Sequence, residues 1–227
     1  MWRVDLDDAR WDGWEWVLDS EERRKAARFR TTQLQQRARR CRAALRCILA
    51  PCCPTPPMQT GSPASLVLLA GRYGKPALAG DALHFNVSHS ERWALVAVSC
   101  APVGVDIEPA LRPDIVVADI AALACHPLEV ARLQGLEDQG DAAIGALMRL
   151  WTQKEAYVKA LGTGLLHALP SVRLMSDPGD AGALVIDESA PAGERYYVHQ
   201  LHAPPLFVAA LCTPLKAPVM AQRHALP

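Results

Sequence analysis

The spacing of apolar residues predicts strands and helices in alternation along this chain of 227 residues. In the first half, residues 2–6 alternate apolar and polar side chains like a strand, and residues 33–50 repeat apolar positions every three or four residues like an amphipathic helix. Short apolar runs predict strands near 65–70 and 93–100, and the proline-rich stretch 51–63 predicts a loop.

Polar residues mark the start of a further helix and the loops of the first half. Asp19 and Ser20 can cap a helix whose first turn carries two glutamates, which the positive end of the helix dipole favours. The segment YGKPAL at 73–78 predicts a turn, and Ser88 and His89 are expected in a loop before the strand at 93.

The second half begins with a predicted strand at 103–108, followed by a helical region over 114–139 and a helix over 141–161. Further strands are expected near 171–175, 183–187, 195–202 and 206–212, before a loose tail of about a dozen residues. Each half therefore offers helices and strands in similar measure. The pattern predicts an α/β (α+β) protein of two subdomains, 1–103 and 104–227.

Composition is typical of a globular protein, with 50% hydrophobic and 21% charged residues. No apolar run reaches the roughly 18 residues that a membrane span needs, and the acidic N-terminal segment lacks the features of a signal peptide. The seven cysteines contain no CxxC pair, which indicates reduced thiols rather than disulfides or zinc. We therefore expect a cytoplasmic protein without a membrane partner.

The net charge of zero hides an uneven distribution. Ten of the 24 basic residues lie within residues 23–46, which contain no Asp or Glu, so the rest of the chain carries 14 basic against 24 acidic residues. Such a block marks a docking place for an anion or an acidic partner, although a solvated helix face is the simpler alternative. With Phe29 as its one aromatic residue and no reader motif, the block does not indicate nucleic acid as a partner.

The acidic and basic residues of two short motifs suggest chemistry on phosphates. Asp106 and Glu108 alternate on the predicted strand GVDIEP, so both carboxylates point to one face, about 6–7 Å apart. Glu155 and Lys159 are four residues apart on a predicted helix and share a face too, although such a pair is most often a surface ion pair. Carboxylates beside a lysine suit a divalent cation and a phosphate-bearing substrate.

Together these segments resemble the 4′-phosphopantetheinyl transferases of the surfactin-synthetase (Sfp) type. The resemblance covers about residues 20–212 and rests on these segments: YGKPAL at 73–78, FNVSHSERWALVAV at 85–98, GVDIEP at 104–109, WTQKEAYVKALGTGL at 151–165 and, more weakly, SVRL at 171–174. It implies a pseudo-dimeric fold, in which each subdomain packs a small antiparallel sheet on helices, and a monomer. The implied reaction moves the phosphopantetheine arm of coenzyme A onto a serine of an apo acyl carrier protein or peptidyl carrier domain and releases 3′,5′-ADP.

The resemblance also assigns site residues. Asp106, Glu108 and Glu155 would hold Mg²⁺, with Mn²⁺ as an alternative. Glu155 would also act as the base toward the serine, and Lys159 would stabilise charge on the phosphates. The other residues expected to contact coenzyme A are Lys75, Pro76, Ser88, His89, Lys154 and, toward its 3′-phosphate, Lys25 and Arg37.

The form WTQKEA, with Ala after Lys-Glu, favours carrier proteins of polyketide or polyunsaturated-lipid synthesis over peptide synthetases. Two alternatives remain. A protein with this fold could bind coenzyme A or a carrier without turnover, but its metal residues or Lys159 should then be missing. A different metal-dependent phosphotransferase could act on a nucleotide, but the chain contains no Walker loop.

Overall fold

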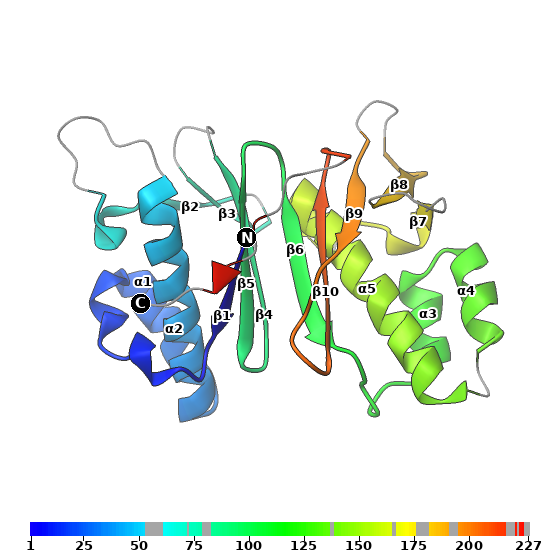
Figure 1. Ribbon diagram of the computed structural model, residues 1–227, viewed down its shortest axis with the longest axis horizontal. Coiled ribbons are helices and arrows are strands. Elements are labelled where there is room, and N and C mark those ends of the chain that lie inside the picture. Colours follow the sequence, from blue (N-terminus) through cyan, green and yellow to red (C-terminus); the bar gives the residue numbers. More distant parts are fainter. Residues whose placement is uncertain are drawn as a thin grey trace.

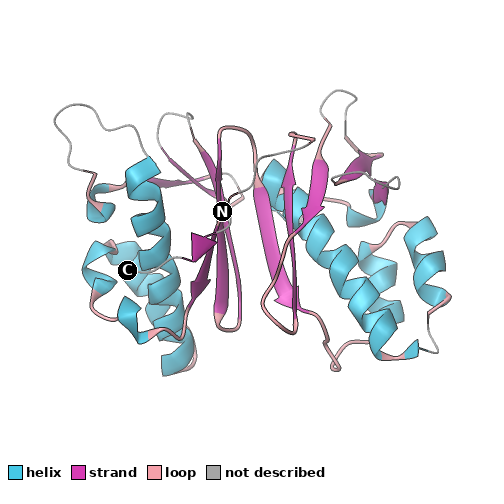
Figure 2. Cartoon of the chain, in the orientation of Figure 1, coloured by secondary structure: helices cyan, strands magenta, loops and turns pink. Residues whose placement is uncertain are grey.

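Helices flank a central set of strands in the computed structural model of the protein (Figures 1 and 2). The structure describes residues 1–52, 61–71, 73–78, 83–136, 139–164, 167–175, 182–190, 195–216, 221 and 223–224. Most of the predicted loop 51–63 lies outside these residues. The mixture of helices with small, mainly antiparallel sheets confirms the α+β prediction.

The first sheet has the order β11-β1-β5-β4. Its strands are β1 (Trp2–Asp5), β4 (His84–Ser90), β5 (Trp93–Ser99) and β11 (Arg223–His224). Two predictions were wrong here. Ser88 and His89 lie on β4, which pairs with β5 along its whole length, rather than in a loop. The tail is not loose throughout, because Arg223 and His224 pair in parallel with β1.

The second sheet has the order β6-β10-β9-β8-β7, and its neighbouring strands are antiparallel. Its strands are β6 (Gly104–Pro109), β7 (Val172–Met175), β8 (Ala183–Asp187), β9 (Tyr197–Gln200) and β10 (Phe207–Thr213). All five strands match their predicted positions within a few residues. A separate hairpin joins β2 (Leu68–Ala70) to β3 (Pro76–Leu78), so the predicted turn 73–78 is partly a strand. Strands β5 and β6 belong to different sheets, and the division into subdomains 1–103 and 104–227 stays a prediction.

The helices of the first half are α1 (Ser20–Ala27) and α2 (Thr32–Leu49). Asp19 caps α1 as predicted, in a box that Glu22 completes. The helices of the second half are α3 (Val117–Ala124), α4 (Pro127–Gln134) and α5 (Asp141–Leu161). The predicted region 114–139 is thus divided, because Pro127 lacks an N–H and begins α4 behind the cap His126. Short 3₁₀ turns lie at Ala9–Trp11, Trp14–Val17, Ala50–Cys52, Pro63–Ser65 and Leu169–Ser171.

Four buried clusters lie within the described residues. The one that contains Leu133 and Leu147 packs α3 and α4 against α5, and the other three hold the sheets. One packs α2 against the first sheet, with Leu45 and Val96 among its members, and another packs α5 against the second sheet, with Ala156 and Val198. The third contains Leu95, Ala97, Val105 and Ile107 together with residues of β10, so it joins the two sheets. β4 and β6 therefore lie side by side in the middle of the molecule (Figure 1).

Acidic side chains near the N-terminus neutralise the arginines of α2. Arg37 pairs with Asp7, Arg39 with Glu15, Arg40 with Asp12, Arg42 with Glu22, and Arg46 with Asp19 and Glu22. The simpler alternative of a solvated helix face is therefore wrong for Arg46, which is buried, whereas the other four arginines pair with acidic groups at partly exposed positions. Within the described residues, no helix is both long and apolar enough to cross a bilayer.

Arg46→Met should destabilise the protein much more than a matched change on the surface. The Arg46 side chain is 1% exposed, and its Nε lies 2.7 Å from Glu22 Oε2. Its removal leaves the buried Glu22 carboxylate with the longer 3.5 Å pair to Arg42 as its remaining ion pair, which should cost about 3 kcal/mol or more. Arg39→Met removes a more exposed pair with Glu15 and should cost at most about 1 kcal/mol. Urea denaturation of both variants tests this, and equal midpoints would contradict it.

Candidate active site

The two carboxylates of β6 share one face, as predicted, and this face meets β4. Ser88 Oγ donates to Asp106 Oδ1 over 2.7 Å, and Ser90 Oγ donates to Glu108 Oε2 over 3.4 Å. Next to them, the Asn86 side-chain oxygen accepts a 2.9 Å bond from the Val105 N–H. Asn86, Ser88 and Ser90, which alternate along β4, thus bond β6 or its carboxylates, and these side-chain bonds fix the register between the two sheets.

Helix α5 brings Glu155 and Lys159 to the same place. Lys159 Nζ donates to Asp106 Oδ1 over 2.5 Å and to Ser88 Oγ over 3.0 Å. The helix can come this close because Gly104, at the start of β6, has no side chain. A Cβ on Gly104 would lie 2.0 Å from the Ala156 carbonyl oxygen. Lys159 is therefore in contact with Asp106, and Glu155 lies near enough for both charges to shift its pKa. The predicted metal set itself stays a prediction.

These carboxylates are crowded and partly dehydrated. Burial and the nearby Asp106 charge raise the pKa of Glu108 to about 7, and burial together with Asp106 also raises the pKa of Glu155. The positive charge of the Lys159 ammonium lowers the pKa of both glutamates and so opposes these effects. Three carboxylates thus share one ammonium in a place where negative charge is unfavourable.

A divalent cation fits this set of oxygen donors. Asp106 is 1% exposed, and its Oδ2 is buried without a hydrogen-bond partner. Mg²⁺ and Mn²⁺ prefer carboxylate oxygens, and a cation here would relieve the excess of negative charge. Within the described residues, no three His, Cys, Asp or Glu side chains already surround one point.

A cavity of about 300 Å³ adjoins Glu155 and Lys159. The turn between β2 and β3 supplies Tyr73, Gly74, Lys75 and Pro76; β4 supplies Asn86 and Val87; and α5 and its end supply Glu155, Val158, Lys159, Gly162 and Gly164. A second cavity, of about 480 Å³, also borders Lys75, Pro76 and Gly162. The cavities therefore continue past the Lys75 side chain along the boundary between the two halves.

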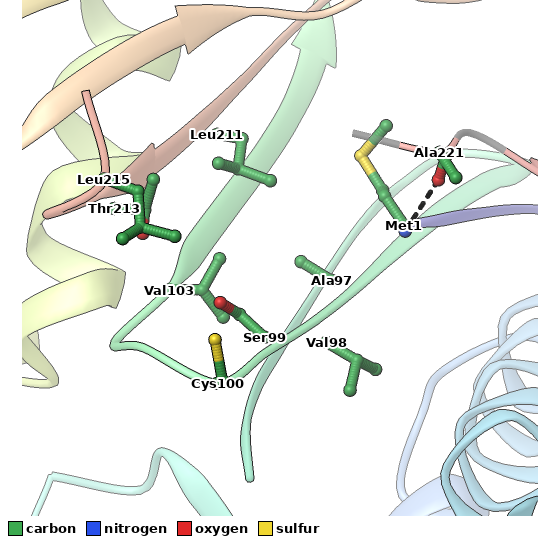
Figure 3. A pocket seen from close by; sticks show the side chains of 10 residues that line it. All are labelled: Met1, Ala97, Val98, Ser99, Cys100, Val103, Leu211, Thr213, Leu215 and Ala221. Carbon is green, nitrogen blue, oxygen red and sulfur yellow. Dashed lines mark hydrogen bonds between the residues drawn. The ribbon is translucent and has the colours of Figure 1, made fainter. Parts of the chain in front are cut away.

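A further cavity, of about 330 Å³, opens elsewhere on this boundary and is mainly apolar (Figure 3). Met1, Val103, Leu211 and Thr213 are among its lining residues, and the Met1 ammonium donates to the Ala221 carbonyl. None of the predicted site residues lines it, so the cavity beside Lys159 is the candidate active site.

Comparison with known proteins gives the family of this chain. The family profile described as the 4′-phosphopantetheinyl transferase superfamily matches residues 102–212, which include both carboxylates of β6 and the motif of α5. The 4′-phosphopantetheinyl transferase HetI of Nostoc sp. is 32% identical over 199 residues, covering 85% of this chain and 78% of the relative. The chain belongs to the 4′-phosphopantetheinyl transferase superfamily.

Other members of the superfamily match shorter segments. The 4′-phosphopantetheinyl transferase gsp of Aneurinibacillus migulanus is 38% identical over 101 residues, or 44% of this chain. A 4′-phosphopantetheinyl transferase of Bacillus subtilis is 34% identical over 137 residues, or 60% of this chain. The chain spans only 40% and 59% of the lengths of these two relatives.

Several residues that were expected to contact coenzyme A do not line the cavity beside Lys159. Lys25 is exposed on α1 and lies 3.5 Å from Glu21, and Arg37 makes two bonds to Asp7. Val87 packs against the cluster that contains α2, and His89, two residues further along β4, lies on that same face rather than on the face that meets β6. Loss of surrounding water, with the Lys159 and Arg42 charges, lowers the pKa of His89.

Two lysines have other partners than expected. Lys75 lines the cavity, but its Nζ donates to the carbonyls of Val103 and Ala160, and burial lowers its pKa to about 8. Lys154 is 0% exposed, and its Nζ bonds two carbonyls and Glu129. The structure does not support the expectation that Lys154 lies near the phosphates, because its ammonium is fully engaged in the interior.

Sequence reasoning missed Asn86, Ser90 and Tyr73. A signal for Asn86 and Ser90 was present, because polar residues alternate with apolar ones in FNVSHS at 85–90. Alternation predicts a strand with one polar face, and a buried polar face needs hydrogen-bond partners. Tyr73 lies in a turn, where no comparable pattern exists.

Proposed function

We propose that this member of the superfamily transfers the 4′-phosphopantetheine arm of coenzyme A to a serine of an apo acyl carrier protein or peptidyl carrier domain, releasing 3′,5′-ADP. The observation that carries the proposal is the convergence of Asp106, Glu155 and Lys159, from two segments about fifty residues apart, beside a cavity at the boundary of the two halves. The names of the relatives support the same activity. We further propose a monomer that acts in the cytoplasm.

Asp106, Glu108 and Glu155 would hold Mg²⁺ or Mn²⁺. A bound ion there supplies positive charge that stabilises the pyrophosphate of coenzyme A as its bond breaks. The partnerless Asp106 Oδ2 and the raised pKa values of the two glutamates support this assignment.

The residues of α5 have separate roles in this proposal. Glu155 would accept the proton of the serine hydroxyl, and, without a metal ion, burial and the Asp106 charge raise the pKa of its carboxyl. Lys159 stabilises the negative charge of the phosphates and can protonate the leaving group. Lys75 and Pro76 border the nucleotide, Ser88 orients Lys159 and Asp106, and Lys25 and Arg37 are proposed for the 3′-phosphate.

The two alternative functions make different predictions. A protein that only binds coenzyme A would not need the complete set of Asp106, Glu108, Glu155 and Lys159, which this chain retains. A nucleotide phosphotransferase would release product from coenzyme A without any carrier protein. Release of 3′,5′-ADP only when a carrier is present would separate the proposed function from both.

Glu155→Gln should lower the transfer rate by about a hundredfold or more, because it removes both a base and a metal ligand. Intact-mass spectrometry of apo carrier proteins with coenzyme A and Mg²⁺ measures the gain of one phosphopantetheine arm. Chelation of the metal should abolish this gain, and added Mg²⁺ or Mn²⁺ should restore it.

Glu15→Gln is the matched control, because Glu15 is exposed and pairs with Arg39 outside the site. It should transfer like the unmodified protein. If no carrier protein of the panel gains mass with the unmodified protein, the proposed function is refuted. If the Glu155→Gln variant has full activity, the proposed role of Glu155 is refuted.

A further inference from the structure

A buried ion pair lies behind the active-site face of α5. The Lys154 and Glu129 residues are 0% and 3% exposed, and Lys154 Nζ lies 2.6 Å from Glu129 Oε2. Lys154 directly precedes Glu155, and an α-helix turns by about 100° per residue, so the two side chains leave α5 in different directions. Glu155 faces the cavity, while Lys154 points into the interior.

Hydrogen bonds around this pair use all its polar atoms. Besides Glu129, Lys154 Nζ donates to the Ala124 carbonyl over 2.9 Å and to the Leu169 carbonyl over 3.2 Å, which engages the three protons of the ammonium. Glu129 Oε2 also accepts from the His126 N–H over 2.9 Å, and Oε1 accepts from the Leu174 N–H over 3.2 Å.

The pair therefore joins α5 to three neighbours: the end of α3, the start of α4, and the segment that leads into β7. In Figure 1, α3 and α4 lie on the outer side of α5, away from β6. On the inner side, the backbone of Gly104 approaches the backbone of α5 at Ala156 and Ala160. Helix α5 is held between these two sets of contacts.

A buried ion pair is a poor source of net stability, because an apolar pair of similar size often serves as well. Unlike an apolar contact, a hydrogen-bonded ion pair is directional, because each of its hydrogen bonds weakens when the donor and acceptor groups rotate relative to one another. The ends of side chains on a helix lie about 5–6 Å from its axis, so a rotation of α5 by about 20° would move Glu155 by about 2 Å. A displacement of that size costs about a hundredfold in the rate of a reaction that needs aligned groups.

We propose that Lys154 and Glu129 are positioning residues whose ion pair fixes the rotation and height of α5, so that Glu155 and Lys159 face Asp106. For its activity readout, this inference rests on the proposed transfer reaction. Lys154 itself contacts neither substrate nor metal in this arrangement. It directly precedes Glu155 in the sequence, but its side chain acts on a different face of the same helix.

The double variant Lys154→Met with Glu129→Gln tests the proposal, because it removes both charges and leaves neither partner buried alone. We expect a folded protein whose KM for coenzyme A stays within about threefold and whose kcat falls at least about thirtyfold. The variant Lys154→Arg with Glu129→Asp keeps an ion pair by combining a longer cation with a shorter anion. It should recover kcat to within about fivefold of the unmodified protein.

A purely structural role predicts a different pattern. The neutral variant, once folded, would then keep the kcat of the unmodified protein at temperatures well below its Tm, and this result would overturn the proposal. The matched control is Arg46→Met with Glu22→Gln, a second buried ion pair that lies in the first half. It should leave kcat within about threefold, because it does not touch α5.

A crystal structure of the neutral variant separates this inference from the proposed function. The distance from Lys159 Nζ to Asp106 Oδ1 should grow by more than about 1 Å. With an active unmodified protein, support requires both this displacement and the loss of kcat, and the absence of either overturns the inference. If the unmodified protein transfers nothing, the proposed function fails, and the crystal structure alone decides whether the pair positions α5.

Discussion

Gly104→Ala is expected to yield little folded protein and to reduce transfer by at least about a hundredfold in the fraction that folds. A Cβ at this position would lie 2.0 Å from the Ala156 carbonyl oxygen, 2.3 Å from the Ala160 nitrogen and 2.8 Å from the Lys159 carbonyl carbon. All three atoms are backbone, so no side-chain rotation relieves the clash. Either β6 or α5 must move, which should cost about 3 kcal/mol or more out of a total stability of about 5–15 kcal/mol.

Such a movement would also separate Lys159 from Asp106, since the two residues stand on the elements that are pushed apart. Gly145→Ala is the matched control, because Gly145 lies within α5 and a Cβ there meets the end of Arg149 at an ordinary 3.5 Å. It should leave stability unchanged or raise it by up to about 1 kcal/mol. Urea denaturation and the transfer assay measure both variants. A Gly104→Ala protein with a normal midpoint would show that the two elements can adjust, contrary to this prediction.

Lys159→Met should lower the transfer rate by about a hundredfold to a thousandfold and, at the same time, tighten the binding of Mn²⁺ to the protein without coenzyme A. Lys159 Nζ bonds Asp106 Oδ1, and its charge lowers the pKa values of Glu108 and Glu155. The ammonium therefore competes with a divalent cation for the same carboxylates. Removing it should lower the Kd for Mn²⁺ by at least about threefold.

Titration of Mn²⁺ followed by electron paramagnetic resonance measures this affinity without any turnover. Lys159→Arg keeps the positive charge and should bind Mn²⁺ like the unmodified protein. Asp106→Asn should weaken Mn²⁺ binding, because it removes a ligand. If Lys159→Met bound Mn²⁺ no more tightly than Lys159→Arg, the ammonium would not compete with the metal for these carboxylates.

Local patterns were sufficient for most elements of the fold. The predicted helix 141–161 has the same bounds as α5, and the predicted helix 33–50 differs from α2 by one residue at each end. Both segments are long and strongly periodic, which is the case in which pattern is most informative. The strand β4 was missed because its polar residues resembled a loop, and their partners on β6 are distant in the sequence.

For the site too, local patterns were sufficient for residues that share one element, but not for contacts between distant segments. Alternation on GVDIEP and the four-residue spacing of Glu155 and Lys159 are sufficient to predict that each pair shares one face of its element. No local pattern shows that Lys154 points away from Glu155 into a buried pair with Glu129. From spacing alone, a lysine beside a catalytic glutamate resembles a second phosphate ligand, and only the packing of α3 and α4 around Lys154 excludes that role.

The sequence by itself determined the class of fold, the two motifs and the family resemblance, because each motif depends on residue types and spacings within a short segment. The set of carboxylates that would hold a metal ion stays a prediction. The tertiary structure alone decided which charged side chains are paired within the protein and which lie at the candidate active site. It showed that acidic residues near the N-terminus neutralise the arginines of α2, that Lys75 and Lys154 bond the interior, and that Lys159 reaches Asp106. The physical reason is that the state of a charge depends on burial and on partners far away in the chain, which spacing does not encode.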